Sequence, residues 1–314
     1  MAAPGTAERI REVNKRYHDV AAADYDAKWG IDFGETGRQQ VLMKFSKALG
    51  RRPDTAFSHA LEIGCGTGYF SLNLLRAGII EHATCTDVSP GMLAALRSNA
   101  RRLGLDVETR TVEATELPFA DASFDLVLGH AVLHHLPDLD ASFEEFARVL
   151  APGGTLAFAG EPSRYGDRIA AVPKRVASEL APLWRRLVGA GALRNGAGAS
   201  SQHAHDHVAH AFEREVDVHA FTPGQLARVA RAAGLDSVRV SGEELVANWF
   251  GWANRTLEAS AKPGEIPMLW RQYAYHGYLL LQQLDQRLLE PRLPAGAFYN
   301  LILSARKPAE GRLR

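Results

Sequence analysis

The sequence predicts an α/β protein with a parallel sheet covered by helices on both faces. Two observations favour this fold class. Strand and helix patterns alternate from about residue 58 to residue 162, and a glycine-rich loop follows the first strand. With 314 residues, 46% of them hydrophobic, the chain has enough apolar material for a sizeable core.

The first five strands are short apolar stretches separated by helical patterns. The helix expected over 89–104 has Ser89 as its N-cap, Pro90 at its first position and Gly104 at its exit. A Pro-Gly-Gly run closes the last helix of this region. We expect strands at 58–64, 81–87, 106–112, 123–129 and 155–162, and helices at 69–78, 89–104 and 139–154.

The rest of the chain adds a capped helix at 222–234, a strand at 235–244 and a last strand within 295–308, with long helical segments between them. Such insertions usually form a cap or an oligomer contact, so a homodimer through them is one expectation. The expected units are an N-terminal helical arm at 1–55, a core at 56–162, a helical or lid insertion at 163–220, a core continuation at 221–241, a second helical insertion at 242–296, and the last core strand with a tail at 297–314.

The composition argues against several classes of protein. Lys plus Arg and Asp plus Glu both number 36, so no overall charge points to nucleic acid. No apolar run approaches the roughly 18 residues of a membrane span, and charges occupy the N-terminus, so we expect a cytoplasmic protein without stable membrane insertion. The two cysteines, Cys65 and Cys85, make a disulfide framework or a cysteine zinc site implausible.

The glycine-rich loop after the first strand has three candidate ligands: a nicotinamide dinucleotide, a nucleotide phosphate and S-adenosylmethionine. Gly64, Gly66 and Gly68 take the first, third and fifth positions of the loop. The dinucleotide-binding fingerprint has glycine at the first, third and sixth positions, and Tyr69 occupies the sixth here. No Gly-Lys-Ser/Thr follows, which argues against a triphosphate loop. Asp87 ends the second strand, where a carboxylate can accept hydrogen bonds from ribose hydroxyls, so an adenosine ligand is favoured.

Five ordered motifs carry a family resemblance: "LEIGCGTGYF", "TDVSPGML", "EATELPFADASFDLV", "HAVLHHLPD" and "RVLAPGGTLAFAGEP". Together they resemble class I S-adenosylmethionine-dependent methyltransferases, especially the small-molecule group compared with ubiquinone and menaquinone methyltransferases. The resemblance covers about 58 to 162 closely. It implies a Rossmann-like, doubly wound seven-stranded sheet with an antiparallel last strand and helical cap insertions.

The resemblance also implies S-adenosylmethionine as cofactor and an N-terminal arm that closes over it. Arg38 is a candidate partner of the methionine carboxylate. Glu113 stands where relatives often have Asp, so its contact to the adenine amino group would shift or be replaced. The cofactor-binding residues expected on this basis are Tyr17, Tyr25, Glu62, Gly64, Cys65, Gly66, Gly68, Asp87, Val88, Met92, Glu113, Ala114 and His130.

The expected reaction is metal-independent methylation of a small, partly apolar acceptor, on oxygen before nitrogen or carbon. A hydroxyl acceptor needs a base, and His130, His135 and Glu161 are the catalytic candidates, with His134 more structural. The histidines of 203–219 are interpreted as a solvated lid segment rather than a metal site, although His207 or His210 could line the acceptor pocket. A protein that binds the cofactor without methyl transfer is the alternative, and a nicotinamide oxidoreductase is a third.

Overall fold

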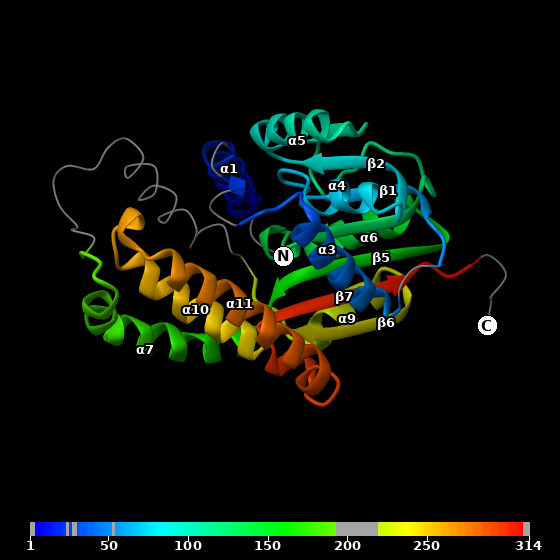
Figure 1. The fold of residues 1–314 in the computed structure, drawn as a ribbon. Helices are drawn as coiled ribbons and strands as arrows, with labels where there is room; N and C mark the ends of the chain where they lie inside the picture. The colour runs from blue at the N-terminus through cyan, green and yellow to red at the C-terminus, as the bar shows by residue number, and fades with distance from the viewer. Residues whose placement is uncertain (1–3, 23–24, 27–29, 52–53, 193–218, 310–314) are drawn as a thin grey trace.

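A computed structural model describes residues 4–22, 25–26, 30–51, 54–192 and 219–309. Within these residues one sheet has the strand order β3-β2-β1-β4-β5-β7-β6 (Figure 1). Strand β7 runs antiparallel to both of its neighbours, and the pairs from β3 to β5 are parallel. The predicted fold class is therefore confirmed. The strands are β1 (Phe57–Ile63), β2 (Ile80–Asp87), β3 (Glu108–Thr111), β4 (Phe124–His130), β5 (Leu150–Pro162), β6 (Asp236–Glu243) and β7 (Asn300–Arg306).

Helices cover both faces of the sheet, because neighbouring residues of a strand point to opposite sides. In β1, Ala60 packs with helices α3 (Glu35–Leu49), α4 (Tyr69–Arg76) and α5 (Pro90–Leu103). Leu61 and Ile63 pack on the other face with α6 (Leu139–Val149) and α9 (Pro223–Ala232). The two cores hold the strands so that their carboxyl ends meet at one edge.

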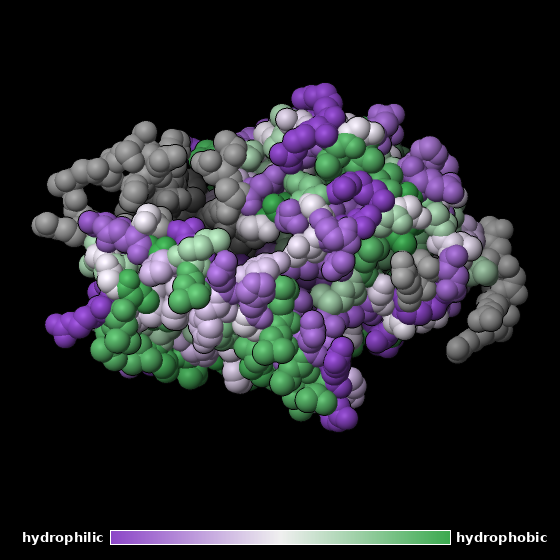
Figure 2. All heavy atoms as spheres, in the orientation of Figure 1, coloured by the Kyte–Doolittle hydropathy of each residue, from purple (hydrophilic) through white to green (hydrophobic). Residues whose placement is uncertain are grey.

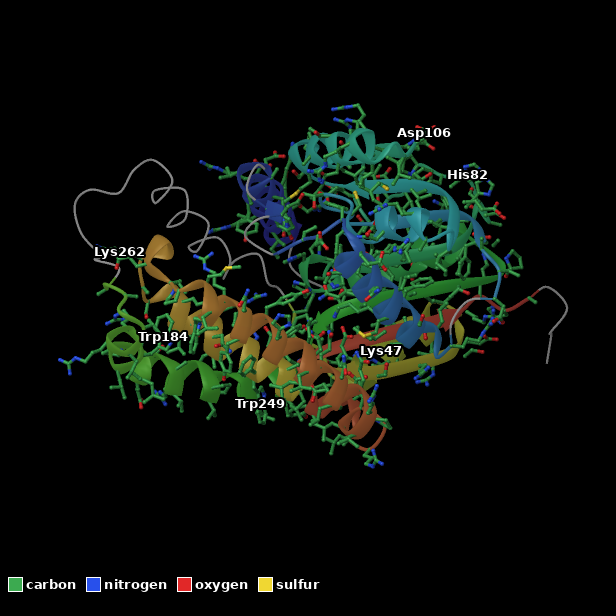
Figure 3. All side chains as sticks on the ribbon, in the orientation of Figure 1. Lys47, His82, Asp106, Trp184, Trp249 and Lys262 are labelled. Atoms are coloured by element: carbon green, nitrogen blue, oxygen red, sulfur yellow. The ribbon has the colours of Figure 1, made fainter. Side chains whose placement is uncertain are left out.

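Three long helices form a layer beyond that edge (Figure 1). Helix α10 (Val246–Ala259) packs against both α7 (Arg164–Val188) and α11 (Met268–Leu284). The indole of Trp184 in α7, labelled in Figure 3, meets that of Trp270 in α11. Their ring centroids are 5.1 Å apart. Shorter turns are η1 (Leu133–His135), η2 (Pro263–Glu265), a π-turn η3 (Asp285–Leu289) and η4 (Ala295–Ala297).

No helix in the ranges given above is both long and apolar enough to cross a bilayer.

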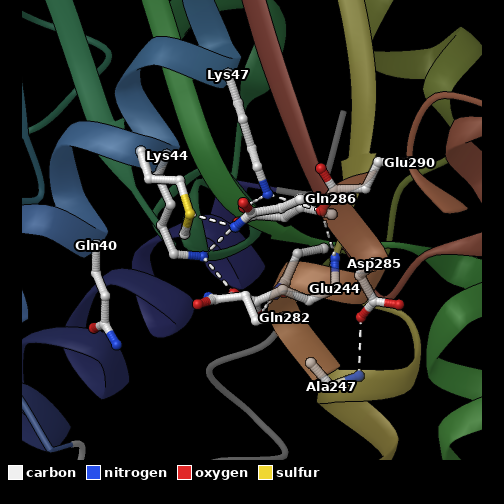
Figure 4. A network of polar contacts seen from close by, with 12 residues as sticks. Gln40, Lys44, Lys47, Glu244, Ala247, Gln282, Asp285, Gln286 and Glu290 are labelled. Carbon is white, nitrogen blue, oxygen red and sulfur yellow. Dashed lines mark hydrogen bonds and ion pairs between the residues drawn. The ribbon is translucent and has the colours of Figure 1, made fainter. Parts of the chain in front are cut away.

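A network of buried charges attaches this layer to the core (Figure 4). Lys44 in α3 forms ion pairs with Glu243 and, at 3.3 Å, with Glu244, at the end of β6. Lys47, one turn later, contacts Glu290 at 2.7 Å, just after η3. Burial opposes the charge on Lys44, but the neighbouring Glu243 and Glu244 raise its pKa well above the ordinary value. We call these five residues the Lys44 network.

Candidate functional site

A pocket opens at the carboxyl edge of β1, β2 and β4, where ligands bind in open α/β sheets. Predicted residues come together there from five separate segments of the chain. Those that line it are Tyr25, Gly64, Gly66, Asp87, Val88, Glu113, Ala114, His130 and His135. Other lining residues, which the sequence did not single out for a ligand, are Arg11, Asn14, His18, Ile63, Thr86, Val112, Thr115, Ala131, Val132, Leu136, Pro137 and Ser142.

The remaining predicted residues lie around the pocket without lining it. Buried Glu62 accepts hydrogen bonds from the amide and the hydroxyl of Ser71, at the start of α4. Burial raises the pKa of Glu62 to about 7. Through its hydrogen bonds with Ser71, the Glu62 carboxyl connects the strand before the glycine loop to the helix that follows the loop. Tyr17, Cys65, Gly68, Met92 and Glu161 are likewise buried and do not line the pocket.

The glycine loop brings backbone close to the pocket. Gly64 has φ of +60°, and a Cβ there would lie 2.3 Å from a methyl of Val132, so a side chain does not fit. Gly66 has φ of +52°, and a Cβ there would meet no atom within 4 Å. The space beside Gly66 is therefore open to a ligand that approaches the backbone.

Asp87 is held in a fixed orientation at the end of β2. Its two carboxylate oxygens accept hydrogen bonds from the amides of Gly66 and Ser89, both at 2.9 Å. Burial raises the pKa of Asp87, and these amides and His18 oppose the rise. Each oxygen keeps a further lone pair that can accept from a ligand hydroxyl.

Glu161 is fully engaged by the loop that follows β4. It accepts hydrogen bonds from the amides of Val132, Leu133 and His134, at 2.9 to 3.1 Å, and it contacts Nδ1 of His134 at 2.8 Å. Its side chain has no exposed surface. The carboxylate therefore shapes η1 and so positions His135 at the pocket, which argues against Glu161 as the base.

His130 lies at the end of β4 with its ring stacked on Phe70, at a centroid distance of 4.6 Å. Burial lowers the pKa of His130 to about 3, and the nearby charge of Lys44 adds to the effect. The imidazole is therefore neutral at physiological pH. It borders the pocket as an uncharged ring.

We expect this burial to make the folded protein acid-sensitive. The folded pKa of about 3 lies below the unfolded value of about 6.5, so between them the unfolded chain binds more protons. Stability should then fall as pH drops through this window, by up to about 1.4 kcal/mol per pH unit from this group. Urea titrations of the protein and of His130→Asn should show a weaker acid dependence in the variant, and equal dependence would contradict the assignment.

Helix α1 (Pro4–Ala21) closes one side of the pocket and is anchored at its middle and near its C-terminal end. Nη1 of Arg11 contacts Oε2 of Glu113 at 2.5 Å, between two half-exposed side chains. Asp19 accepts hydrogen bonds from the hydroxyl of Ser89 at 2.5 Å and from the amide of Gly91 at 3.0 Å. The arm is thus held against the segments that carry Asp87 and Glu113.

One polar atom in the pocket wall remains without a hydrogen bond among the described residues. The amide of Asn14 donates through Nδ2 to the carbonyl of Ile10 at 3.0 Å, but its buried Oδ1 accepts nothing. A buried acceptor without a donor is costly, so a ligand N–H or O–H there would stabilise the site. The open space beside Gly66, the acceptor lone pairs of Asp87 and this oxygen suit an adenosine ligand.

Other predicted residues lie elsewhere. Arg38 pairs with Glu35 at 2.5 Å on the surface of α3 and does not line the pocket. His219 contacts the carbonyl of Leu136 through Nε2 at 3.0 Å. His203, His205, His207 and His210 lie outside the described residues. In the described part of the chain, no three histidine, cysteine or acidic side chains are grouped as metal ligands.

Comparison with known proteins gives a coherent result. Residues 61–158 match a family described as a methyltransferase domain. The 27-O-demethylrifamycin SV methyltransferase of Amycolatopsis mediterranei is 34% identical over 158 residues, which cover 46% of this chain and 57% of that one. The chain spans about half the length of the first curated relatives it matches.

Two solved structures share the fold over nearly the whole chain. The phosphoethanolamine N-methyltransferase 2 of Haemonchus contortus, solved with S-adenosylhomocysteine, has a TM-score of 0.58 at 16% identity and covers 95% of this chain and 60% of its own. The [4+2]-cyclase SpnF has a TM-score of 0.56 at 21% identity, over 96% of this chain and 97% of its own. At these identities the likeness concerns the fold alone.

Proposed function

We propose that this chain, which carries a methyltransferase domain of the class I S-adenosylmethionine-dependent type, transfers a methyl group from that cofactor to a small molecule. The match over residues 61–158 confirms the resemblance drawn from the five motifs. The observation that supports the activity best is the pocket where the glycine loop, Asp87 and His135 meet under α1.

Each group at the pocket has a distinct part in this proposal. S-adenosylmethionine, when bound, supplies an electrophilic methyl group on a positively charged sulfur. The carboxylate of Asp87 accepts hydrogen bonds from the ribose hydroxyls, and Oδ1 of Asn14 accepts one further donor. Holding both reactants in line supplies much of the rate of such a displacement.

We favour oxygen as the atom that is methylated, and a small, partly apolar molecule as the acceptor. One relative is named for an O-methyl position. His135, one of the histidines that line the pocket, can take the proton of a hydroxyl as the new bond forms. His130, being neutral and stacked on Phe70, then serves as an uncharged wall.

Calorimetric titration tests the cofactor. We expect the protein to bind S-adenosylmethionine and S-adenosylhomocysteine, and Asp87→Asn to weaken both about tenfold to 100-fold, the effect of a charge-assisted hydrogen bond worth about 1.5–3 kcal/mol. Asp106→Asn is the matched control, because Asp106 is exposed at the far end of the sheet (Figure 3). Binding of NAD instead would overturn the cofactor.

A second assay separates methyl transfer from binding alone. The fold also includes a protein named as a [4+2]-cyclase, so a bound cofactor would not by itself establish the reaction. Methyl-labelled S-adenosylmethionine and a panel of apolar hydroxyl compounds should give labelled products extractable into organic solvent. Tight cofactor binding with no labelled product from any oxygen, nitrogen or carbon acceptor would favour the alternative, a cofactor-binding protein that transfers no methyl group.

A further inference from the structure

An apolar stripe runs along the outer side of α7. Seven large apolar side chains share it, at spacings of three or four residues, and their exposed fractions reach from 40% to 78%. They are Tyr165, Ile169, Val172, Val176, Leu180, Leu183 and Leu187. At 100° per residue, all seven fall within about 80° of the helix circumference. We call this set the α7 stripe.

The stripe lies about 110° around the helix from the face that holds α7 in the protein. The inward side chains are Ala170, Ala177, Ala181 and Trp184, which are all buried, and α7 packs closely against α10. Green side chains over α7 at the lower edge of Figure 2 show this apolar surface turned to the outside. Contiguous exposed apolar surface of this kind marks an interaction site.

A row of positive charge borders the stripe along one flank. Arg164, Arg168, Arg175 and Arg186 are all exposed and fall within about 40° of one another around the helix. Glu179 lies between this row and the stripe, and it leaves the flank with a net charge of about +3. The helix therefore combines an apolar stripe with an adjacent basic row, the pattern of helices that lie in a membrane interface.

We propose that α7 docks on an anionic phospholipid surface, with the stripe in the acyl boundary and the arginine row against the headgroups. The helix of 25 residues extends about 37 Å along such a surface. It begins directly after β5, at the sheet edge that carries the pocket. An acceptor that partitions into lipid would thus be presented near the proposed active site, although the docking itself is independent of the proposed function.

The positive charge beside the α7 stripe disfavours a second copy of the chain as its binding partner. A two-fold pairing through the stripe would use the same surface on both copies, and we consider the arrangement in which the two α7 helices are antiparallel. Equivalent flanks then face each other, so two rows of about +3 would be opposed. An anionic surface complements the same charge.

Vesicle flotation of the full chain tests the proposal. We expect binding to phosphatidylcholine vesicles that contain phosphatidylserine, and much weaker binding to phosphatidylcholine alone or at high salt. Leu183→Gln with Leu187→Gln should lower the vesicle partition coefficient about tenfold or more, because the variant no longer has two exposed leucine side chains to bury in the acyl boundary. Ala171→Gln with Ser178→Gln is the matched control, since both residues are exposed on α7 outside the stripe.

The outcomes are distinct. Binding that the control pair retains and the leucine pair loses supports the proposal. Failure of the wild type to bind the anionic vesicles at low salt would overturn it, as would equal binding by the leucine pair. If light scattering shows a dimer that the leucine pair converts to a monomer, and vesicles are not bound, the stripe is an interface between copies. Circular dichroism of both pairs verifies that the helices remain intact.

Discussion

In a His135→Asn variant, we expect the rate of methyl transfer to a hydroxyl acceptor to fall about 10²–10⁴-fold, the usual effect of removing a general base. The side chain lines the pocket from η1, within ring contact of His18 and His134. Asparagine cannot take the proton, but it preserves a polar side chain of similar size. Affinity for S-adenosylhomocysteine should therefore remain within a factor of about three, because the loss falls on the chemical step.

His82→Asn is the control, since His82 is an exposed histidine at the opposite edge of the sheet (Figure 3). Its rate should equal that of the wild type. Single-turnover measurements with an acceptor from the labelled screen would separate the chemical step from product release. An undiminished rate in His135→Asn would assign the proton to another group, and an equal loss of cofactor affinity would make His135 a binding residue.

The strand and helix order of the core could be predicted because its signals are local. Ser89, Pro90 and Gly104 bound α5 as expected, and the side chain of Ser89 caps the helix through the amide of Met92. The glycine loop and Asp87 are adjacent through strand pairing of β1 with β2, which the alternation of elements implies. These parts of the site follow from short-range rules.

The arm residues were harder to predict for a physical reason. Arg11, Asn14 and His18 lie three or four residues apart, so they share one face of α1. On a lone amphipathic helix such a polar face indicates solvent exposure, whereas here it forms the pocket wall. Their spacing was the available signal, but the docking of α1 depends on distant partners such as Glu113.

Glu161 illustrates a different difficulty. Its place at the end of β5 made it a candidate base, since carboxylates there reach the ligand crevice. In the structure, the oxygens of Glu161 accept hydrogen bonds from three backbone amides and contact the ring of His134. Which lone pairs a buried carboxylate has free depends on the loop packed against it, and a sequence pattern does not determine that.

The Lys44 network leads to a large expected effect on stability. Lys44 is 199 residues from Glu243 and 200 residues from Glu244 in the sequence, so nothing local predicts the pairing. In Lys44→Met, the free energy of unfolding should fall by about 3–5 kcal/mol, because Glu243 and Glu244 would be left buried with incomplete pairing. Lys262→Met, which breaks the exposed pair with Glu265, should cost at most about 1 kcal/mol.

The pH dependence separates lost charge pairing from lost packing. In the wild type, Lys44 offsets the burial of Glu244 and keeps the pKa of that carboxyl below its usual value, so stability falls as acid protonates it. In Lys44→Met, burial without this cation raises the pKa, so the folded variant gains protons and recovers stability as pH falls. The difference in free energy of unfolding between the wild type and Lys44→Met should therefore become smaller as pH falls from about 7 to about 5. A constant gap in urea titrations would assign the loss to packing alone, and the network would then hold α3 against β6 by contact rather than by charge.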